Sequence, residues 1–232
     1  MSDPARQRNR EDRIYLDHAA TSPLRSEVAD AMRDAVGEAD YNPSSPHDFG
    51  RRARSRLEDA RRTLASAIGA DRRDLVFTGG GTQSDNLAVL GFARAHRDRE
   101  PRLLVSAVEH KAVLGAADQA EREGARVERI PVDGTGTVRL DALEAALAGG
   151  DGAPTLVSLM WANNEVGTVQ PVAQAAELAH RHGAVLHTDA VQALGKTPVD
   201  VDEAGVDLLT ATAHKLGGPV GIGLLLVAGD VE

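Results

Sequence analysis

The apolar positions of the chain fall into short runs, and helix-like amphipathic segments separate most of them. The apolar runs end at Phe77, Val108, Val132, Trp161, Thr188, Thr212 and Val227. The helical segments between them cover 83–96, 110–123, 140–148 and 172–182. This alternation predicts an α/β fold, in which a mostly parallel, seven-stranded sheet carries helices on both faces. Only a Gly-Pro turn separates the last two runs, too little for a crossover helix, so the last strand is expected to be antiparallel.

The first part of the chain lies outside this alternation. Residues 1–25 are expected to form an N-terminal arm that ends in a loop of small residues, and residues 26–232 a single large domain. Two helices are expected before the sheet begins, one over 24–36 and one over about 49–68.

Composition excludes several classes of protein. Apolar residues make up 42% of the chain and charged residues 26%, as in ordinary globular proteins. The net charge is −9 without a dominant basic stripe, which argues against nucleic-acid binding. No apolar run reaches the roughly 18 residues of a membrane span, and no secretory signal is recognisable, so a cytoplasmic protein is expected. The chain has no cysteine, which excludes a disulfide framework and a cysteine nucleophile within these residues.

Lys215 follows the sixth apolar run and precedes a Gly-Gly-Pro turn. A lysine held at the end of a buried strand is partly desolvated, which lowers its pKa and suits Schiff-base chemistry. The alternative is a surface lysine that enters a turn.

A glycine-rich turn follows the first sheet strand and leads into a helix. Backbone N–H groups near Gly81 and Thr82, together with the Thr82 hydroxyl, could bind a phosphate at the helix N-terminus. The alternative is a glycine turn with a capped helix. The spacing matches neither a P-loop nor the dinucleotide fingerprint, so nucleotide binding is not favoured.

Three further polar residues stand at strand ends. His110 could stack on a planar ligand, relay a proton or cap a helix. Asn164 could donate to a ring hydroxyl or belong to a plain turn. Asp189 could pair with a protonated pyridine nitrogen, bind a metal with His187, or act as a structural cap.

Together these residues are the parts needed to hold pyridoxal 5'-phosphate. Lys215 would form the imine, Asp189 would keep the ring nitrogen protonated, and the glycine turn would fix the phosphate. A metal site built from His180, His182, His187 and Asp189 is less favoured. His180 and His182 are two residues apart near a helix end and therefore point to different faces.

The same residues carry a resemblance to a known family. From residue 14 to about 227 the chain resembles the cysteine desulfurases of the class V aminotransferase group, of the type that serves iron–sulfur cluster assembly. The matching motifs are YLDHAAT at 15–21, NPSSPH at 42–47, FTGGGTQSDN at 77–86, EHKAV at 109–113, NNEVG at 163–167, HTDAVQ at 187–192 and HK at 214–215. The resemblance implies the large domain of a fold-type I enzyme that depends on pyridoxal phosphate.

The resemblance also implies a role for each candidate residue. Lys215 would attach the cofactor and later move protons at the substrate Cα, Asp189 would pair with the pyridinium nitrogen, and Gln192 would bond the ring oxygen. His110 would stack on the ring and act in acid–base steps, and Asn164 would lie beside the ring and the substrate carboxylate. The residues implied to hold the phosphate are Gly81, Thr82, Thr212 and His214.

In the family, L-cysteine is split to L-alanine and its sulfur leaves as a persulfide on an enzyme cysteine. The resemblance implies a homodimer and a sulfur-accepting or scaffold protein as partners. The family's acceptor cysteine and its smaller C-terminal domain have no counterpart in the 232 residues, so a truncated, cofactor-binding portion is expected. Two alternatives stay open: a related lyase or aminotransferase such as selenocysteine lyase, and a module that binds the cofactor without turnover.

Overall fold

A computed structural model of the chain describes residues 14–36, 41–229 and 231. The first thirteen residues of the expected N-terminal arm lie outside this range. The described part of the arm, from Ile14 onward, contains a turn at 17–20 and then leads into the first described helix.

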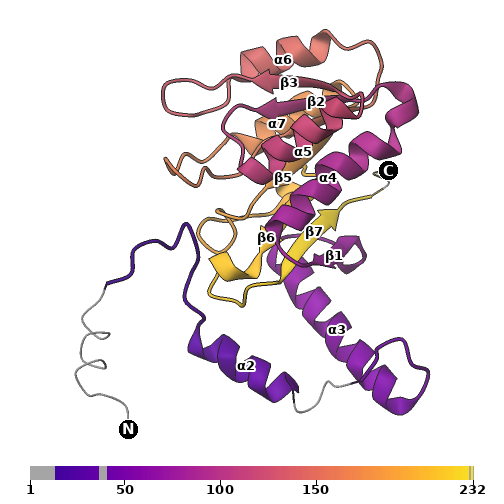
Figure 1. Ribbon diagram of the computed structural model, residues 1–232, viewed down its shortest axis with the longest axis vertical. Coiled ribbons are helices and arrows are strands. Elements are labelled where there is room, and N and C mark those ends of the chain that lie inside the picture. The colour runs from indigo at the N-terminus through magenta and orange to yellow at the C-terminus, as the bar shows by residue number, and fades with distance from the viewer. Residues whose placement is uncertain (1–13, 37–40, 230, 232) are drawn as a thin grey trace.

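A seven-stranded sheet forms the centre of the molecule, in the order β1-β7-β6-β5-β4-β2-β3 (Figure 1). Its strands are β1 (Leu75–Thr78), β2 (Arg102–Ser106), β3 (Arg126–Ile130), β4 (Thr155–Ser158), β5 (Val185–Asp189), β6 (Leu208–Thr212) and β7 (Gly223–Val227). Strands β2 to β6 pair in parallel, and β7 is antiparallel to both of its neighbours, β6 and β1. The predicted α/β fold and the antiparallel last strand are confirmed.

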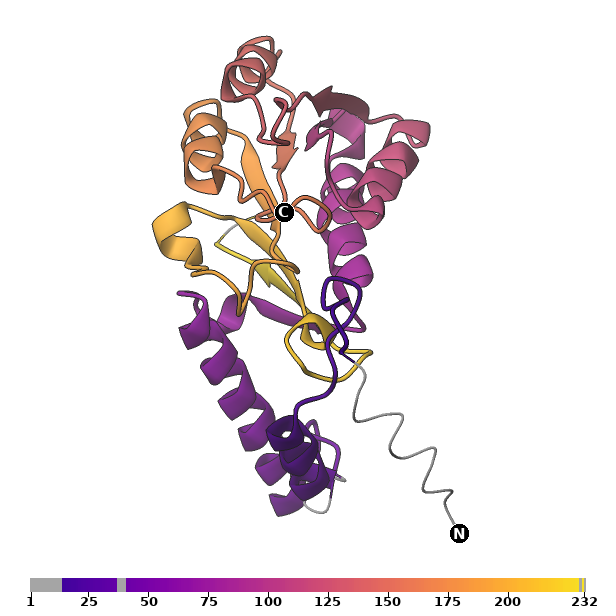
Figure 2. The ribbon, with the colours of Figure 1, turned by 90° about the vertical axis from the view of Figure 1, so that its left-hand side faces the viewer.

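Helices cover both faces of the sheet, as predicted. The α-helices are α2 (Ser26–Val36), α3 (Asp48–Ala67), α4 (Gly81–Ala95), α5 (Lys111–Arg122), α6 (Leu140–Ala148), α7 (Val172–Arg181) and the short α8 (Val201–Ala204). Three 3₁₀ turns cover Arg72–Asp74, Arg97–Arg99 and Ala213–Lys215. Figure 2 shows α4 and α5 on one side of the sheet and α6 and α7 on the other. Two buried apolar clusters result, one on each side of the sheet.

Three strands end earlier than their apolar runs predict. β2 ends at Ser106, β3 at Ile130 and β4 at Ser158, whereas the runs continue to Val108, Val132 and Trp161. After β4, Leu159 and Met160 are each only 1% exposed without belonging to the strand. The backbone nevertheless continues to bond the neighbouring strand, because Leu159 N donates to the carbonyl of His187 at 3.0 Å and Trp161 N to that of Asp189 at 2.9 Å.

The first two helices are only loosely tied to the core. α2 buries no residue and α3 buries only Gly50 and Ala65, and both extend away from the sheet in Figure 1. Phe49, Leu57 and Met32 are accordingly exposed on them. Among the described residues, no helix combines the length and the apolar character that crossing a bilayer requires.

Candidate active site

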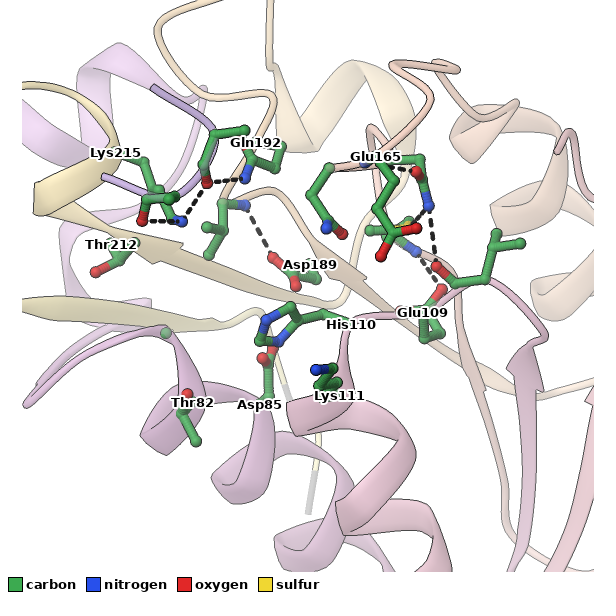
Figure 3. A pocket seen from close by; sticks show the side chains of 18 of the residues that line it. Thr82, Asp85, Glu109, His110, Lys111, Glu165, Asp189, Gln192, Thr212 and Lys215 are labelled. Carbon is green, nitrogen blue, oxygen red and sulfur yellow. Dashed lines mark hydrogen bonds between the residues drawn. The ribbon is translucent and has the colours of Figure 1, made fainter. Parts of the chain in front are cut away.

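The carboxyl ends of the parallel strands open into a cavity of about 1440 Å³ (Figure 3). Its walls come from the segments after each of the strands β1 to β6, and from Ala19 and Ala20 of the N-terminal arm. Ligands of open α/β sheets bind at this edge. The residues predicted to hold the cofactor all line the cavity: Gly81, Thr82, His110, Asn164, Asp189, Gln192, Thr212, His214 and Lys215. The sequence thus predicted that these residues meet at one edge of the sheet. The role of each residue stays a prediction.

Lys215 lies in the 3₁₀ turn after β6, three residues beyond the end of that strand. Its Nζ donates to the backbone carbonyls of Ala19 and Ala20, the latter at 2.6 Å. Burial lowers the pKa of Lys215, and the positive charge of Lys196 lowers it further, while Asp17 and Asp189 act in the opposite direction. The amine is thus partly desolvated and biased towards the neutral, nucleophilic form.

Asp189 is the last residue of β5, and it is only 4% exposed. Its Oδ1 accepts a hydrogen bond from Val191 N at 2.9 Å. Burial raises the pKa of Asp189, whereas the Val191 hydrogen bond and the charges of His110 and Lys215 oppose that rise. A buried carboxylate facing a cavity needs a positively charged partner, and a protonated ring nitrogen of a ligand would be one.

His110 precedes α5 and caps it. Its Nδ1 accepts from Ala112 N at 3.2 Å, which assigns the ring proton of a neutral His110 to Nε2. The capping interpretation from the sequence is therefore correct for one ring nitrogen. The ring nonetheless lines the cavity and stands next to Asp189, as Figure 3 shows.

The glycine turn leads into the N-terminus of α4. Gly80 occupies the N-cap position with a φ of 150°, and α4 begins at Gly81. A Cβ on Gly81 would lie 3.0 Å from Val191 Cγ2. Gly79 N donates to Gln83 Oε1 at 2.6 Å, so the Gln83 side chain, from the first turn of α4, holds the glycine turn. The first backbone N–H groups of α4 thus face the cavity without a side-chain cap, as an anion site requires.

Two of the predicted phosphate ligands already have partners within the chain. The Thr212 hydroxyl donates to the carbonyl of Ile222 at 3.0 Å. His214 Nδ1 lies 3.1 Å from the Thr21 hydroxyl of the N-terminal arm, and burial lowers the pKa of His214, with Lys215 adding to the effect. A phosphate would therefore accept from His214 through Nε2, or displace the Thr21 contact.

The two candidates with amide side chains differ in what they contact. Gln192 Nε2 donates to the carbonyl of Ala19 at 2.9 Å, while its Oε1 accepts from Lys196 Nζ at 2.7 Å. Asn164 is half-buried at the cavity wall. Its neighbour Asn163 makes the turn, because Asn163 Oδ1 accepts from the backbone N–H groups of Glu165 and Val166. Asn164 is left facing the cavity.

The sequence interpretation missed two buried acids, Asp85 on α4 and Glu109 after β2, which are 1% and 6% exposed. Each has a buried carboxyl oxygen that accepts no hydrogen bond within the described chain. Helical periodicity could have indicated that Asp85 is buried, because Asp85 lies on the same helix face as the buried Ala88, Val89 and Phe92. Burial raises the pKa of Glu109 and the nearby Asp189 adds to the rise, while the hydrogen bond from Met160 N opposes it.

The less favoured metal quartet is not assembled. His180 Nε2 bonds Asp207 at 2.9 Å, at the edge of the sheet opposite the cavity. Both ring nitrogens of His187 bond hydroxyl groups, Nδ1 that of Ser158 and Nε2 that of Thr210. This arrangement leaves neither histidine available beside Asp189.

Comparison with known proteins gives a consistent result. Residues 14–232 match the family model described as aminotransferase class-V. Cysteine desulfurase IscS of Dictyoglomus turgidum is 45% identical over 92% of this chain and 54% of its own length. The cysteine desulfurase of Cereibacter sphaeroides is 47% identical over 92% of the chain and 55% of its own length. The chain thus spans about half the length of the curated relatives it matches.

Solved structures agree with this match. A NifS-like protein superposes with a TM-score of 0.89 and 34% identity, over 94% of this chain and 60% of the other. A structure described as SspA in complex with cysteine gives a TM-score of 0.85 and 32% identity, over 92% of this chain and 60% of the other.

Proposed function

The chain belongs to the class V aminotransferase family, and from this premise we propose that it is the pyridoxal 5'-phosphate-binding part of a cysteine desulfurase. The observation that carries the proposal is the meeting of Lys215, Asp189 and the glycine turn at one cavity. The relatives are named for this activity, and one similar structure was described in complex with cysteine.

Each chemical group of the cofactor has a matching group of the chain in the cavity. A partly desolvated amine matches an aldehyde, a buried carboxylate matches a pyridine nitrogen, and an uncapped helix N-terminus matches a phosphate. The glycines at the start of α4 bring the backbone close to the cavity, where a Cβ at Gly81 would press on Val191. We therefore assign Lys215 to covalent attachment, Asp189 to the ring nitrogen, and Gly81 and Thr82 to the phosphate.

The remaining candidates receive supporting roles. His110 would cover one face of the ring, Gln192 would contact the ring oxygen, and Asn164 would bind beside the substrate carboxylate. The phosphate would also contact Thr212 and His214. The cofactor, when bound, supplies a carbonyl that condenses with amines and a ring that withdraws electrons from the substrate Cα. Lys215, whose pKa burial lowers, would then take and return the proton at that carbon.

The reaction needs a thiol that these residues do not supply. L-cysteine and an acceptor thiol give L-alanine and an acceptor persulfide, with the C–S bond broken and an S–S bond formed. Since the 232 residues include no cysteine, the acceptor thiol must come from outside them. We propose a sulfur-accepting or scaffold protein as partner, iron–sulfur cluster assembly or thio-cofactor synthesis as the destination, and a cytoplasmic homodimer as the working form.

A second candidate is a related lyase such as selenocysteine lyase, which would need no acceptor thiol on the enzyme. The two candidates predict different products. The deciding experiment supplies the cofactor-loaded chain with L-cysteine and dithiothreitol, or with L-selenocysteine, and measures alanine, sulfide and selenide. Alanine and sulfide from L-cysteine support the desulfurase. Selenide without sulfide supports the lyase, and cofactor binding without any product supports a binding module.

A further inference from the structure

A second carboxyl group lies close to Asp189 in the wall of the cavity. Asp85, the fifth residue of α4, is 1% exposed, and Asp189 at the end of β5 is 4% exposed. An oxygen of each, together with a ring nitrogen of His110, lies within 4.8 Å of the other two. Figure 3 shows Asp85 reaching towards His110 from below and Asp189 from above. Two carboxylates this close, in a buried site, do not both stay ionised at neutral pH.

The surroundings decide which of the two keeps the negative charge. Asp189 accepts a backbone N–H at 2.9 Å, and His110 and Lys215 favour its ionised form. Asp85 has an oxygen without any hydrogen-bond partner among the described residues, and its nearest basic group is His187 Nε2 at 3.8 Å. Burial lowers the pKa of His187 to about 3, so this ring is neutral and offers no counter-charge. Burial raises the pKa of Asp85 well above its usual range and the charge of Asp189 adds to the rise, while the Thr210 hydroxyl opposes it without reversing it.

Behind Asp85 runs a row of buried hydrogen bonds across three strands. The Thr210 hydroxyl on β6 lies beside the Asp85 side chain, where its interaction with the carboxyl group lowers the pKa of Asp85 and so opposes the effect of burial. Thr210 Oγ1 lies 3.1 Å from His187 Nε2 on β5, and His187 Nδ1 lies 2.8 Å from Ser158 Oγ on β4. His187 and Thr210 are 0% exposed and Ser158 is 1% exposed. Because a neutral imidazole carries a single N–H, the row can run in only one direction at a time.

We propose that Asp85 is a positioning residue for Asp189: it holds a proton at neutral pH, donates it to Thr210, and leaves the single negative charge of the pair on Asp189. Thr210 then donates to His187 Nε2, and His187 Nδ1–H donates to Ser158. The inference rests on the proposed function in so far as Asp189 faces a ring nitrogen. The direction of the hydrogen bonds that join Thr210, His187 and Ser158 does not depend on a bound cofactor.

The other ionisable groups around the pair are consistent with this assignment. Glu109, from the loop after β2, is buried as well, which raises its pKa, and its Oε1 accepts from Met160 N at 2.6 Å. His110, from the N-terminus of α5, and Lys215, after β6, both act on Asp189. Thus α4 contributes a neutral acid, and β5 contributes the ionised acid that faces the ligand.

The opposite arrangement makes a different, measurable prediction. If Asp85 were ionised, it would accept from Thr210, and Thr210 would accept from His187 Nε2–H. The proton of His187 would then lie on Nε2 instead of Nδ1. The tautomer of His187 therefore reports the protonation state of Asp85.

The first test is ¹⁵N NMR of the ring nitrogens of His187 in the cofactor-free chain at neutral pH, assigned with a His187→Gln variant. The expected result is the Nδ1–H tautomer. Observation of the Nε2–H tautomer, or of a doubly protonated ring, overturns the proposal. This measurement uses the wild-type chain and does not depend on any variant folding.

The second test uses the cofactor with a ¹⁵N label at its ring nitrogen, bound to the wild-type chain and to Asp85→Asn, Asp189→Asn and the exposed control Asp34→Asn. The ring nitrogen is expected to stay protonated in Asp85→Asn and in the control, and to lose its proton in Asp189→Asn. Loss of the proton in Asp85→Asn as well would overturn the proposal, since Asp85 would then carry charge. If the wild-type chain binds no cofactor, the proposed function fails, and the His187 tautomer still decides this inference.

Discussion

Substitution of Gly223 by alanine would test how the end of β7 holds the glycine turn in place. Gly223 is the first residue of β7, where it pairs with Thr78 on one side and Thr212 on the other. An added Cβ would collide with Thr78 Oγ1, and it would lie 2.5 Å from the carbonyl carbon of Gly80 and 2.6 Å from its Cα. Two of these three atoms belong to the backbone and cannot rotate away.

The size of the effect follows from that geometry. Overpacking in a buried site costs about 1–3 kcal/mol when neighbours must shift. For a chain of this length each kcal/mol lowers the melting temperature by about 2–4 °C, so we expect a fall of about 2–12 °C. Any relief of the clash moves Gly80, the N-cap of α4, and so disturbs the proposed phosphate site. Affinity for pyridoxal phosphate should therefore fall together with stability.

The assay is thermal unfolding with and without the cofactor, combined with a binding titration for each variant. Gly115→Ala serves as the matched control, because Gly115 is an exposed residue of α5 whose added Cβ would meet nothing within 4 Å. Removal of a glycine from a helix interior should stabilise the control by up to about 1 kcal/mol without affecting the cofactor. A Gly223→Ala protein with the melting temperature and cofactor affinity of the parent would refute the reasoning.

Three further predictions concern the acids and the lysine of the cavity. Asp189→Ala should lose turnover more than cofactor affinity, since the phosphate site stays intact; an equal collapse of both, measured by kinetics and titration, would contradict this division of roles. Burial raises the pKa of Glu109, so this carboxyl holds its proton in the folded chain after the unfolded chain has released it, and the contribution of Glu109 to stability should fall as pH rises above about 4. Glu109→Gln should flatten that fall by up to about 1.4 kcal/mol per pH unit in urea titrations, and an unchanged slope would count against a protonated Glu109. Because burial lowers the pKa of Lys215, borohydride trapping of the cofactor should begin at a lower pH than trapping on free lysine, and coincident pH profiles would disprove the shift.

The sequence was sufficient to predict the sheet, because its strands are short apolar runs buried on both faces, and to predict which candidate residues meet. Parallel strands bring their carboxyl ends to one edge, so Lys215, Asp189 and the glycine turn had to lie near one another. The exact strand ends were less predictable, since the backbone of residues such as Leu159 still bonds the neighbouring strand beyond the last residue of β4. Asp85 was overlooked because a single acid in an amphipathic helix usually faces solvent, and only the packing of α4 on the sheet shows otherwise.

Hydrogen-bond partners were the least predictable part of the site. The contacts of Lys215 with the carbonyls of Ala19 and Ala20 join residues almost 200 positions apart in the sequence. No local pattern predicts a contact of this kind, which depends on how the N-terminal arm crosses the cavity.

Every role assigned in the cavity depends on covalent attachment of the cofactor to Lys215, which borohydride reduction followed by peptide mass spectrometry can locate. Lys196 and Lys111 also lie near the cavity, so Lys196→Ala and Lys111→Ala provide matched controls. The account predicts one reduced pyridoxyl adduct, located on Lys215, present in both controls and absent from Lys215→Ala. An adduct that persists in Lys215→Ala, or a wild-type chain that forms none, would contradict it.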